Sequence, residues 1–316
     1  MTSPIKIGVS SCLLGEKVRY DGGHKHDRYI TDVLGRFFLF VPVCPELECG
    51  MPVPREAMRL EGDPAAPRLI THKSRADKTE QMLAFCRAKV EALALEDLCG
   101  FIFKKGSPSS GLFRVKVYDH AGVPSKTGSG LFAASVARRF PHLPMEEEGR
   151  LVDASLRENF IERVFSYRRW KDFLADGPDL GKLVQFHTRQ KLLVMSHSTQ
   201  LYREMGALVA HGKESAWPEL AERYQELFLR ALELQATVKK QTNVLMHIMG
   251  YFKKELGGEE KQELLELIGQ YHDGLVPLVV PVTLLKHYVN KYRQEYLQQQ
   301  VYLSPHPAEL MLRNHA

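Results

Sequence analysis

The stretch Ile5–Cys12 reads IKIGVSSC, an apolar and β-branched run that ends at a thiol. This pattern is typical of a strand buried on both faces, as in a parallel sheet. Similar runs follow at Phe38–Cys44, Gly100–Phe103 and Arg114–Tyr118, and helical patterns separate the first three. Strands that alternate with helices indicate a mostly parallel sheet covered by helices. We therefore predict a Rossmann-like α/β domain over about residues 1–150.

The chain after this domain has helical periodicity almost to its end. We interpret the acidic cluster Glu146–Glu148, which follows Pro144, as a junction. Breaks at Gly177-Pro178, Gly257-Gly258 and Pro277 punctuate the pattern that follows. The sequence therefore predicts an all-α domain over residues 151–316. Its expected helices cover about 153–175, 181–211, 218–254, 259–271 and 281–302.

Composition limits the classes of protein that this chain can belong to. Its 316 residues suit two domains, and 44% hydrophobic with 26% charged residues is a soluble globular balance. The longest apolar run, Gly274–Leu285, contains two prolines and is too short to span a bilayer. We also find no secretory signal at the N-terminus, so we expect a cytoplasmic protein with no membrane partner. The net charge of +5 permits an anionic partner but does not require one.

Reactive side chains follow the first three predicted strands, at the point where each strand ends. Cys12 follows the first strand, Cys44 and Glu46 follow the second, and the loop Ser107–Gly111 follows the third. In parallel α/β sheets, ligands bind outside the carboxyl ends of the strands. We therefore expect these groups to meet at one edge of the sheet. The alternative for Cys12 and Cys44 is that both are small buried residues at strand ends.

Five cysteines in a chain without an export signal indicate thiols or metal ligands and not a disulfide framework. Cys86 falls on the apolar stripe of a predicted helix, so core packing is its better interpretation. Cys99 opens the third strand, about 20 Å from the loop at the other end. Cys49 lies five residues past Cys44, and it either folds back toward the site or is a buried loop thiol.

Four motifs in this order resemble the thiouracil desulfidase (TudS-like) family. They are Ser11–Gly15, Val18–Lys25, Cys44–Glu46 and Ser107–Gly111. The resemblance covers about residues 5–140. The chain from about Gly149 resembles the helical YbgA-like domain that is often fused to this family. The two-domain arrangement is similar to that of desulfidases that remove sulfur from 4-thiouridine in tRNA.

The resemblance implies a [4Fe–4S] cluster held by three cysteines, which leaves one iron open. The family's loop usually reads Ser-Pro-Ser-Cys-Gly, but this chain has Ser110 at the cysteine position. Thiolates are the normal ligands of such clusters, so there are three alternatives. Cys49 is the third ligand, Ser110 binds through oxygen, or the cluster has been lost. On reach and softness we favour Cys12, Cys44 and Cys49 as the metal ligands.

The chemistry of a desulfidase suits these residues. A soft thiocarbonyl sulfur should bind an open iron that acts as a Lewis acid without redox change. Glu46 is then the catalytic proton acceptor, and Ser107 or Ser109 orients the attacking water or donates to the departing sulfur. The structural alternatives are a solvated carboxylate for Glu46 and an ordinary turn or a phosphate-binding loop for the serine loop.

Arg19, His24 and Lys25 follow Cys12 and either bind an anionic phosphate of the substrate or form a solvated edge. The leading hypothesis is an Fe–S-dependent desulfidase that converts thiouridine to uridine and releases sulfide. We favour tRNA as the partner because of the added domain. The alternatives are free thiouracil or a thiolated nucleotide as substrate, a zinc hydrolase with the same ligands, and a non-catalytic RNA- or nucleotide-binding protein with a degenerate cluster site.

Overall fold

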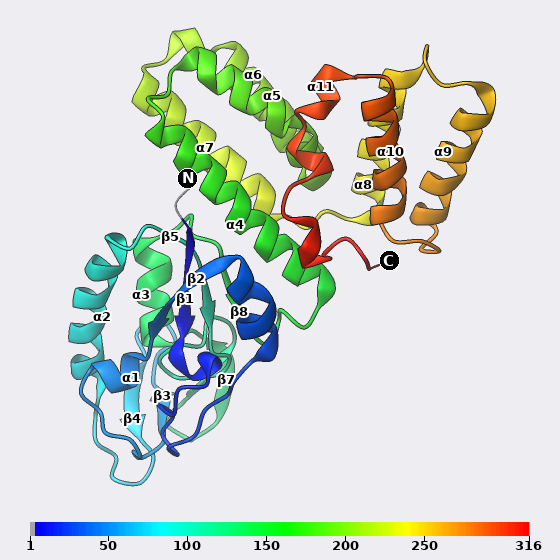
Figure 1. Ribbon diagram of the computed structural model, residues 1–316. Helices are drawn as coiled ribbons and strands as arrows, with labels where there is room; N and C mark the ends of the chain where they lie inside the picture. Colours follow the sequence, from blue (N-terminus) through cyan, green and yellow to red (C-terminus); the bar gives the residue numbers. More distant parts are fainter. Residues whose placement is uncertain (1–3, 316) are drawn as a thin grey trace. The chain divides into compact units, whose positions relative to one another are not determined.

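The computed structural model describes residues 4–315 and divides into two compact units, residues 1–153 and 154–316 (Figure 1). The first unit contains the strands, and the second is built from helices. This arrangement confirms the predicted fold class, an α/β domain followed by an all-α domain. Among residues 4–315, no helix is both long and apolar enough to cross a membrane.

A four-stranded parallel sheet in the order β2-β1-β5-β8 forms the centre of the first unit. Every neighbouring pair in it is parallel, and Ser10 at the end of β1 lies opposite Val43 at the end of β2. Because these ends are aligned, the chain leaves both strands at the same edge, where the site lies. The four strands are β1 (Ile5–Ser10), β2 (Phe38–Val43), β5 (Leu98–Phe103) and β8 (Met145–Glu147).

The edge strand β8 corrects the interpretation of the acidic cluster as a junction. Glu147 is buried in this strand, and its carboxylate accepts hydrogen bonds from the backbone N–H groups of Leu112 and Phe113 at 2.9 and 3.1 Å. Glu146 is also buried and accepts a hydrogen bond from Arg150 at 2.7 Å. Buried carboxylates are tolerated when such partners satisfy them. A charged sequence can therefore form a strand here.

A second four-stranded sheet, in the order β4-β3-β6-β7, corrects the prediction of a single sheet. The run at Arg114–Tyr118 forms β6, which pairs with β3 and β7 and not with the parallel sheet. The proline-rich stretch of residues 51–71 contains the other pair, β3 and β4. The four strands are β3 (Met58–Glu61), β4 (Arg68–Thr71), β6 (Val115–Tyr118) and β7 (Pro124–Gly128).

Two helices, α2 (Thr79–Ala94) and α3 (Leu131–Arg139), pack against each other beside the parallel sheet (Figure 1). The ring of Phe132 on α3 contacts the rings of Phe101 and Phe103 on β5. The helix α2 buries the apolar stripe that its sequence predicts, Cys86 included. This confirms the assignment of Cys86 to the core. Shorter turns are η1 (Ser11–Leu14), η2 (Tyr29–Val33), η3 (Leu34–Arg36) and α1 (Pro45–Glu48).

The second unit has a helical core around Trp170, which stacks against Tyr224 and Phe173. Three of the expected helices, those at 181–211, 218–254 and 281–302, are each split. The side chain of Ser198 accepts a hydrogen bond from the N–H of Leu201 and so begins a new helix. The side chain of Thr237 accepts one from the N–H of Lys240 and begins another. The helices are α4 (Ala154–Ala175), α5 (Leu180–His197), α6 (Thr199–Ala210), α7 (Trp217–Glu233), α8 (Val238–Met249), α9 (Gly258–His272), α10 (Val279–Lys291) and α11 (Glu295–Gln298).

Candidate functional site

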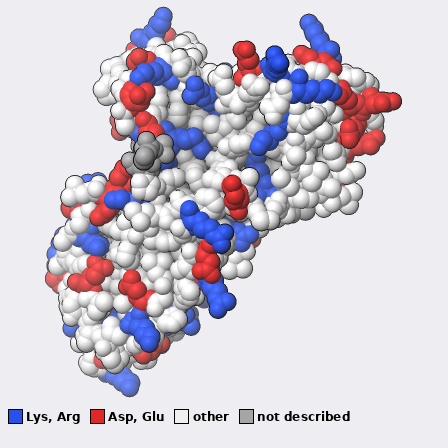
Figure 2. All heavy atoms as spheres, viewed as in Figure 1, with Lys and Arg blue, Asp and Glu red and all other residues white. Residues whose placement is uncertain are grey.

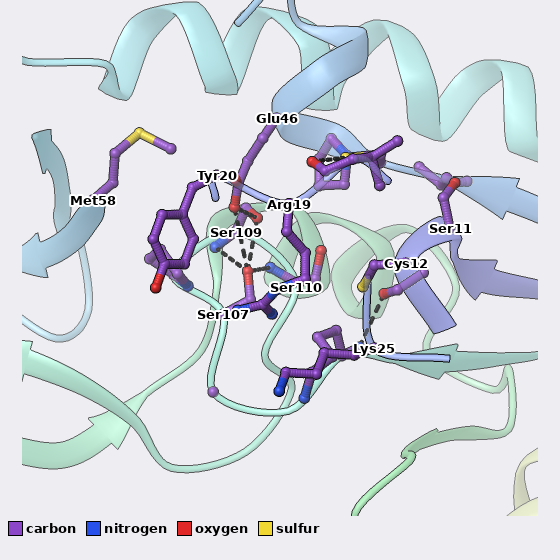
Figure 3. Close-up of a pocket in the computed structure, with 18 of the residues that line it drawn as sticks. Ser11, Cys12, Arg19, Tyr20, Lys25, Glu46, Met58, Ser107, Ser109 and Ser110 are labelled. Atoms are coloured by element: carbon purple, nitrogen blue, oxygen red, sulfur yellow. Dashed lines mark hydrogen bonds between the residues drawn. The ribbon is translucent and has the colours of Figure 1, made fainter. Parts of the chain in front are cut away.

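One cavity of about 460 Å³ lies at the carboxyl edge of the parallel sheet (Figure 3). Cys12 reaches it from η1 directly after β1, and Cys44 reaches it from the residue that precedes α1 after β2. The loop Ser107–Ser110 reaches it after β5. The structure therefore brings together the groups that the strand-end argument selects from three separate strands.

The carboxylate of Glu46 is the centre of a hydrogen-bond network in this cavity. Its Oε1 accepts a hydrogen bond from the hydroxyl of Ser109 at 2.7 Å and a longer one from Ser107 at 3.4 Å. The two serine hydroxyls also contact each other at 2.9 Å. Figure 3 shows both serines turned toward the carboxylate of Glu46. A carboxylate and two hydroxyls in contact can orient water and pass protons.

Arg55 holds the other oxygen of Glu46 and was not predicted from the sequence. Its Nε donates to Glu46 Oε2 at 2.9 Å, its Nη2 makes a second contact with the same oxygen, and that Nη2 also donates to the carbonyl of Val18 at 3.0 Å. Both side chains of the pair are largely buried. Arg55 therefore fixes the carboxylate and connects it to the loop that follows Cys12. It lies in proline-rich coil, where no spacing rule indicates it.

The serine loop is a tight turn with little room to move. The N–H of Gly111 donates to the carbonyl of Ser107 at 2.8 Å, and the hydroxyl of Ser107 accepts from the N–H groups of Ser109 and Ser110. A Cβ atom at Gly130 would lie 2.5 Å from the backbone of Ser109, so only glycine permits this packing. The hydroxyls are consequently presented in a fixed orientation.

The two thiols at the cavity are desolvated. Burial raises the pKa of Cys12 to about 11, although the ammonium of Lys104 opposes this shift. Burial also raises the pKa of Cys44, whose Sγ lies 3.8 Å from the carbonyl oxygen of Val18. Such thiols are neutral at pH 7 and weak nucleophiles, but a metal can displace their protons. Lys104, which pairs with Glu148, also lines the cavity and was not assigned a role from the sequence, although it follows a strand end.

Ser110 lines the same cavity as the two thiols. It is 4% exposed, and within residues 4–315 its hydroxyl makes no hydrogen bond, although its backbone N–H donates to Ser107. An oxygen without a protein partner therefore faces the space that Cys12 and Cys44 line.

Two of the predicted site residues lie away from the cavity. Cys49 ends α1 with its Sγ 3.2 Å from the carbonyl oxygen of Glu46, and it does not line the cavity. The short helix after Cys44 turns this thiol away, which spacing alone does not reveal. His24 is exposed and accepts a hydrogen bond from the N–H of His26. In the described part of the chain, no three His, Cys, Asp or Glu side chains are placed to hold a metal ion.

Three further basic side chains line the cavity. Arg19 and Lys25, both predicted to bind an anion, line the cavity together with Lys105. Arg19 lies 3.5 Å from Asp21, whereas the ammonium groups of Lys25 and Lys105 have no ion pair among residues 4–315. This leaves positive charge available for a ligand at the rim.

Comparison with known proteins gives the class to which this fold and site belong. Residues 7–148 match the family described as 2-thiouracil desulfurase. Residues 191–307 match the family described as Protein of unknown function (DUF1722). The chain thus joins a domain similar to the 2-thiouracil desulfurase family to a helical domain, which confirms the resemblance drawn from the four motifs.

The chain is 33% identical over 160 residues to the uncharacterized protein YbgA of Escherichia coli (strain K12). That match spans 50% of this chain and 94% of YbgA, and this chain belongs to the YbgA family. It is also similar to a solved structure titled [4Fe-4S]-dependent thiouracil desulfidase TudS, with 28% identity and a TM-score of 0.38. The match covers 47% of this chain and 94% of that one.

Proposed function

We propose that this protein is an Fe–S-dependent, non-redox desulfidase that converts 4-thiouridine in tRNA to uridine. In the overall reaction a thiocarbonyl and water give a carbonyl and hydrogen sulfide, so no electron donor is needed. One observation carries the proposal: Cys12, Cys44, Ser110 and the Glu46–Ser109 pair converge on one cavity from separate strand ends. The match to the 2-thiouracil desulfurase family supports the reaction class.

Three residues of this chain, Cys12, Cys44 and Ser110, would hold the cluster. Cys12 and Cys44 supply two thiols, and Ser110 supplies an oxygen that has no hydrogen bond within the described residues. We favour Ser110 over the expected ligand Cys49, because Cys49 does not line the cavity and its Sγ lies 3.2 Å from the carbonyl oxygen of Glu46. When bound, a [4Fe–4S] cluster with three protein ligands offers one open iron, a Lewis acid for a soft sulfur. The raised thiol pKa values mean that binding would release protons.

The chain's own residues handle water and protons. Glu46, fixed by Arg55, accepts a proton at Oε1 from the attacking water. The hydroxyl of Ser109, 2.7 Å from the same oxygen, is placed to relay that proton, and Ser107 holds Ser109 in position. Water contributes its oxygen to the base, and its protons leave with the sulfide.

The basic side chains that line the cavity favour an anionic substrate. Arg19, Lys25 and Lys105 line the opening, and two of these three cations have no ion pair among residues 4–315. A free thiobase has no phosphate to occupy them, whereas a nucleotide or RNA does. On the face shown in Figure 2, basic and acidic side chains are interspersed, so we expect moderate and not tight attraction to RNA. The α/β unit carries every group the reaction needs, and a second unit of 163 residues supports a larger substrate.

A substrate panel tests this proposal with the full chain, reconstituted anaerobically with iron and sulfide. We expect kcat/KM to be highest for thiolated tRNA, lower for 4-thiouridine monophosphate and lowest for 2-thiouracil. Higher salt should reduce kcat/KM for tRNA far more than for thiouracil. A preference for the mononucleotide would assign the protein to salvage of free nucleotides. Tight RNA binding without sulfide release would identify a non-catalytic binding protein.

A further inference from the structure

The helical unit contains a second polar cavity, of about 210 Å³, that belongs to no site described so far. One wall is a face of α4 on which Ser155, Glu158, Asn159 and Glu162 recur at spacings of three and four residues. Helices in globular proteins usually bury their apolar face, so a buried polar face needs partners. The other lining residues come from the start of α8, the ends of α5 and α9, and His315 near the C-terminus.

Glu162 has its partners within the protein. Its Oε1 is 2.5 Å from Nε2 of His197, whose Nδ1 contacts the carbonyl of Leu234 at 2.6 Å. Burial raises the pKa of Glu162, but His197 and Arg313 outweigh it and hold the pKa at about 2. Glu162 is therefore a structural carboxylate.

Glu158, one turn earlier on α4, is not satisfied in this way. Its carboxylate oxygens lie 3.4 Å from Nε of Arg313 and 3.5 Å from Nε2 of His315, longer than ordinary hydrogen bonds. Nε and Nη2 of Arg313 are themselves buried and lack a hydrogen-bond partner among the described residues, and the side chain is 7% exposed. Glu158 therefore lines the cavity with unused acceptor capacity.

Three further side chains line the cavity, and within residues 4–315 each has a hydrogen-bonding atom without a partner. Asn159 donates its Nδ2 to the carbonyl of Leu232 at 3.0 Å, which leaves its Oδ1. Gln241 accepts from the hydroxyl of Tyr302 at 2.7 Å, which leaves its Nε2. Within residues 4–315 the hydroxyl of Tyr271 makes no hydrogen bond. The cavity thus offers a carboxylate, an amide oxygen, an amide nitrogen and a hydroxyl to a ligand.

We propose that this cavity binds a small planar molecule with adjacent N–H donors, which pair side by side with the carboxylate of Glu158. The Watson–Crick edge of a guanine base and a guanidinium group share this chemistry. Carboxylates accept two parallel N–H bonds from such groups. Gln241 Nε2 and the hydroxyl of Tyr271 are placed to donate to a ring carbonyl. The volume is below that of a drug-sized pocket and suits a single ring system.

Binding should be linked to the protonation of Glu158. Burial raises the pKa of Glu158 to about 7, against the opposing effect of Arg313. A ligand that donates two N–H bonds binds the ionised carboxylate, so protonation of Glu158 competes with binding. Affinity should therefore fall up to tenfold for each pH unit below 7. The titratable and charged groups around Glu158 are Glu162 on its own helix, His197 on α5, Tyr271 on α9, and Tyr302, Arg313 and His315 in the C-terminal part of the chain.

The test is equilibrium dialysis of the full chain, without iron, against guanosine, inosine and methylguanidinium at pH 8 and pH 6. We expect guanosine to bind at least tenfold more tightly than inosine, which lacks the 2-amino group. Glu158→Gln should abolish this preference and the pH dependence, and Tyr271→Phe should weaken guanosine binding with the fold intact. Glu263→Gln, on the exposed surface of α9, is the matched control.

Binding of methylguanidinium alone, lost in Glu158→Gln, would support the same site with a guanidinium compound as its ligand. The proposal is overturned if neither probe binds, or if Glu158→Gln binds guanosine as the unaltered protein does. Because iron and thiolated substrates are absent from this experiment, its outcome is independent of the desulfidase activity.

Discussion

At the scale of single residues, Glu46 differs from a solvated loop carboxylate because each of its oxygens has a fixed partner. The guanidinium of Arg55 binds one oxygen, and the hydroxyl of Ser109 binds the other. Such a carboxylate is oriented before any substrate arrives, which is the condition for efficient proton transfer. In the proposed mechanism the carboxylate of Glu46, and not the guanidinium of Arg55, carries the proton.

Glu46→Gln should keep the shape of this group while removing its ability to accept a proton. We expect kcat for sulfide release to fall about 10²-fold or more, with bound iron unchanged. The exposed carboxylate Glu80 on α2 provides the control, because Glu80→Gln should leave both quantities unaltered. An undiminished rate in Glu46→Gln would remove Glu46 from the mechanism.

A second prediction concerns iron binding by variants of the three proposed ligands. Cys12→Ala and Cys44→Ala should each abolish iron binding, because thiolates are the normal ligands of such a cluster and each variant leaves only one. Ser110→Ala should reduce bound iron and shorten the lifetime of the cluster in air. Ser110→Cys should raise both, because a thiolate is the better ligand for iron. Iron content by mass spectrometry and the visible charge-transfer band are the readouts.

Cys49→Ala distinguishes this ligand set from the one expected from spacing. Its thiol lies beside the carbonyl of Glu46 and outside the cavity, so iron content should be unaffected. Cys86→Ala, in the core of α2, is the control for packing loss alone. Loss of iron in Cys49→Ala with full iron in Ser110→Ala would restore Cys49 as the third ligand.

At the scale of elements, the apolar strands were predictable and the charged one was not. The runs that form β1, β2 and β5 have no competing interpretation, and their ends bring Cys12 and Cys44 together. The strand β8 was hidden because its buried Glu147 is satisfied by the distant backbone N–H groups of Leu112 and Phe113, which no local pattern reports, while Glu146 is satisfied by Arg150. Arg55 was also missed, because its partner Glu46 is nine residues away and no local pattern links the two.

Gly8 in the middle of β1 determines how closely the aromatic layer packs on the sheet. A Cβ atom at Gly8 would lie 2.2 Å from the ring of Phe101 on the neighbouring strand. Gly8→Ala should therefore destabilise the α/β unit by about 1–3 kcal/mol, the usual cost of overpacking. Urea unfolding followed by circular dichroism measures this change.

Both tryptophans, Trp170 and Trp217, lie in the helical unit, so their fluorescence reports on that unit alone. The midpoint detected by tryptophan should not change in Gly8→Ala if the two units unfold separately. An equal shift in both signals would show that they unfold together. No shift in either signal would mean that the β1–β5 contact tolerates a methyl group.

At the scale of the whole molecule, two buried glutamates of the helical unit should make stability depend on pH in opposite directions. In the helical unit the pKa of Glu158 is raised to about 7 from the ordinary 4.5, mainly by burial. The folded state therefore keeps a proton that the unfolded state loses. Its contribution to stability is fully present below pH 4.5 and is lost as pH rises toward 7, by roughly 2–3 kcal/mol.

Glu162 has the opposite sign, because His197 and Arg313 hold its pKa at about 2. Its contribution is present above pH 4.5 and is lost as pH falls toward 2. Urea midpoints detected by tryptophan fluorescence should therefore peak near pH 4.5–5. Glu158→Gln should flatten the slope between pH 4.5 and 7 and leave the acid limb intact. A slope unchanged by this substitution would contradict the assignment to Glu158.

The proposed function requires that the cavity of Cys12, Cys44 and Ser110 holds a cluster that supports desulfidation. The most direct measurement is sulfide release from thiolated tRNA by the anaerobically reconstituted chain, with iron determined on the same sample and no electron donor added. We predict brown protein with about four irons per chain and one sulfide released for each 4-thiouridine lost. Colourless protein with stoichiometric zinc, or iron-loaded protein that releases no sulfide without a reductant, would contradict the account.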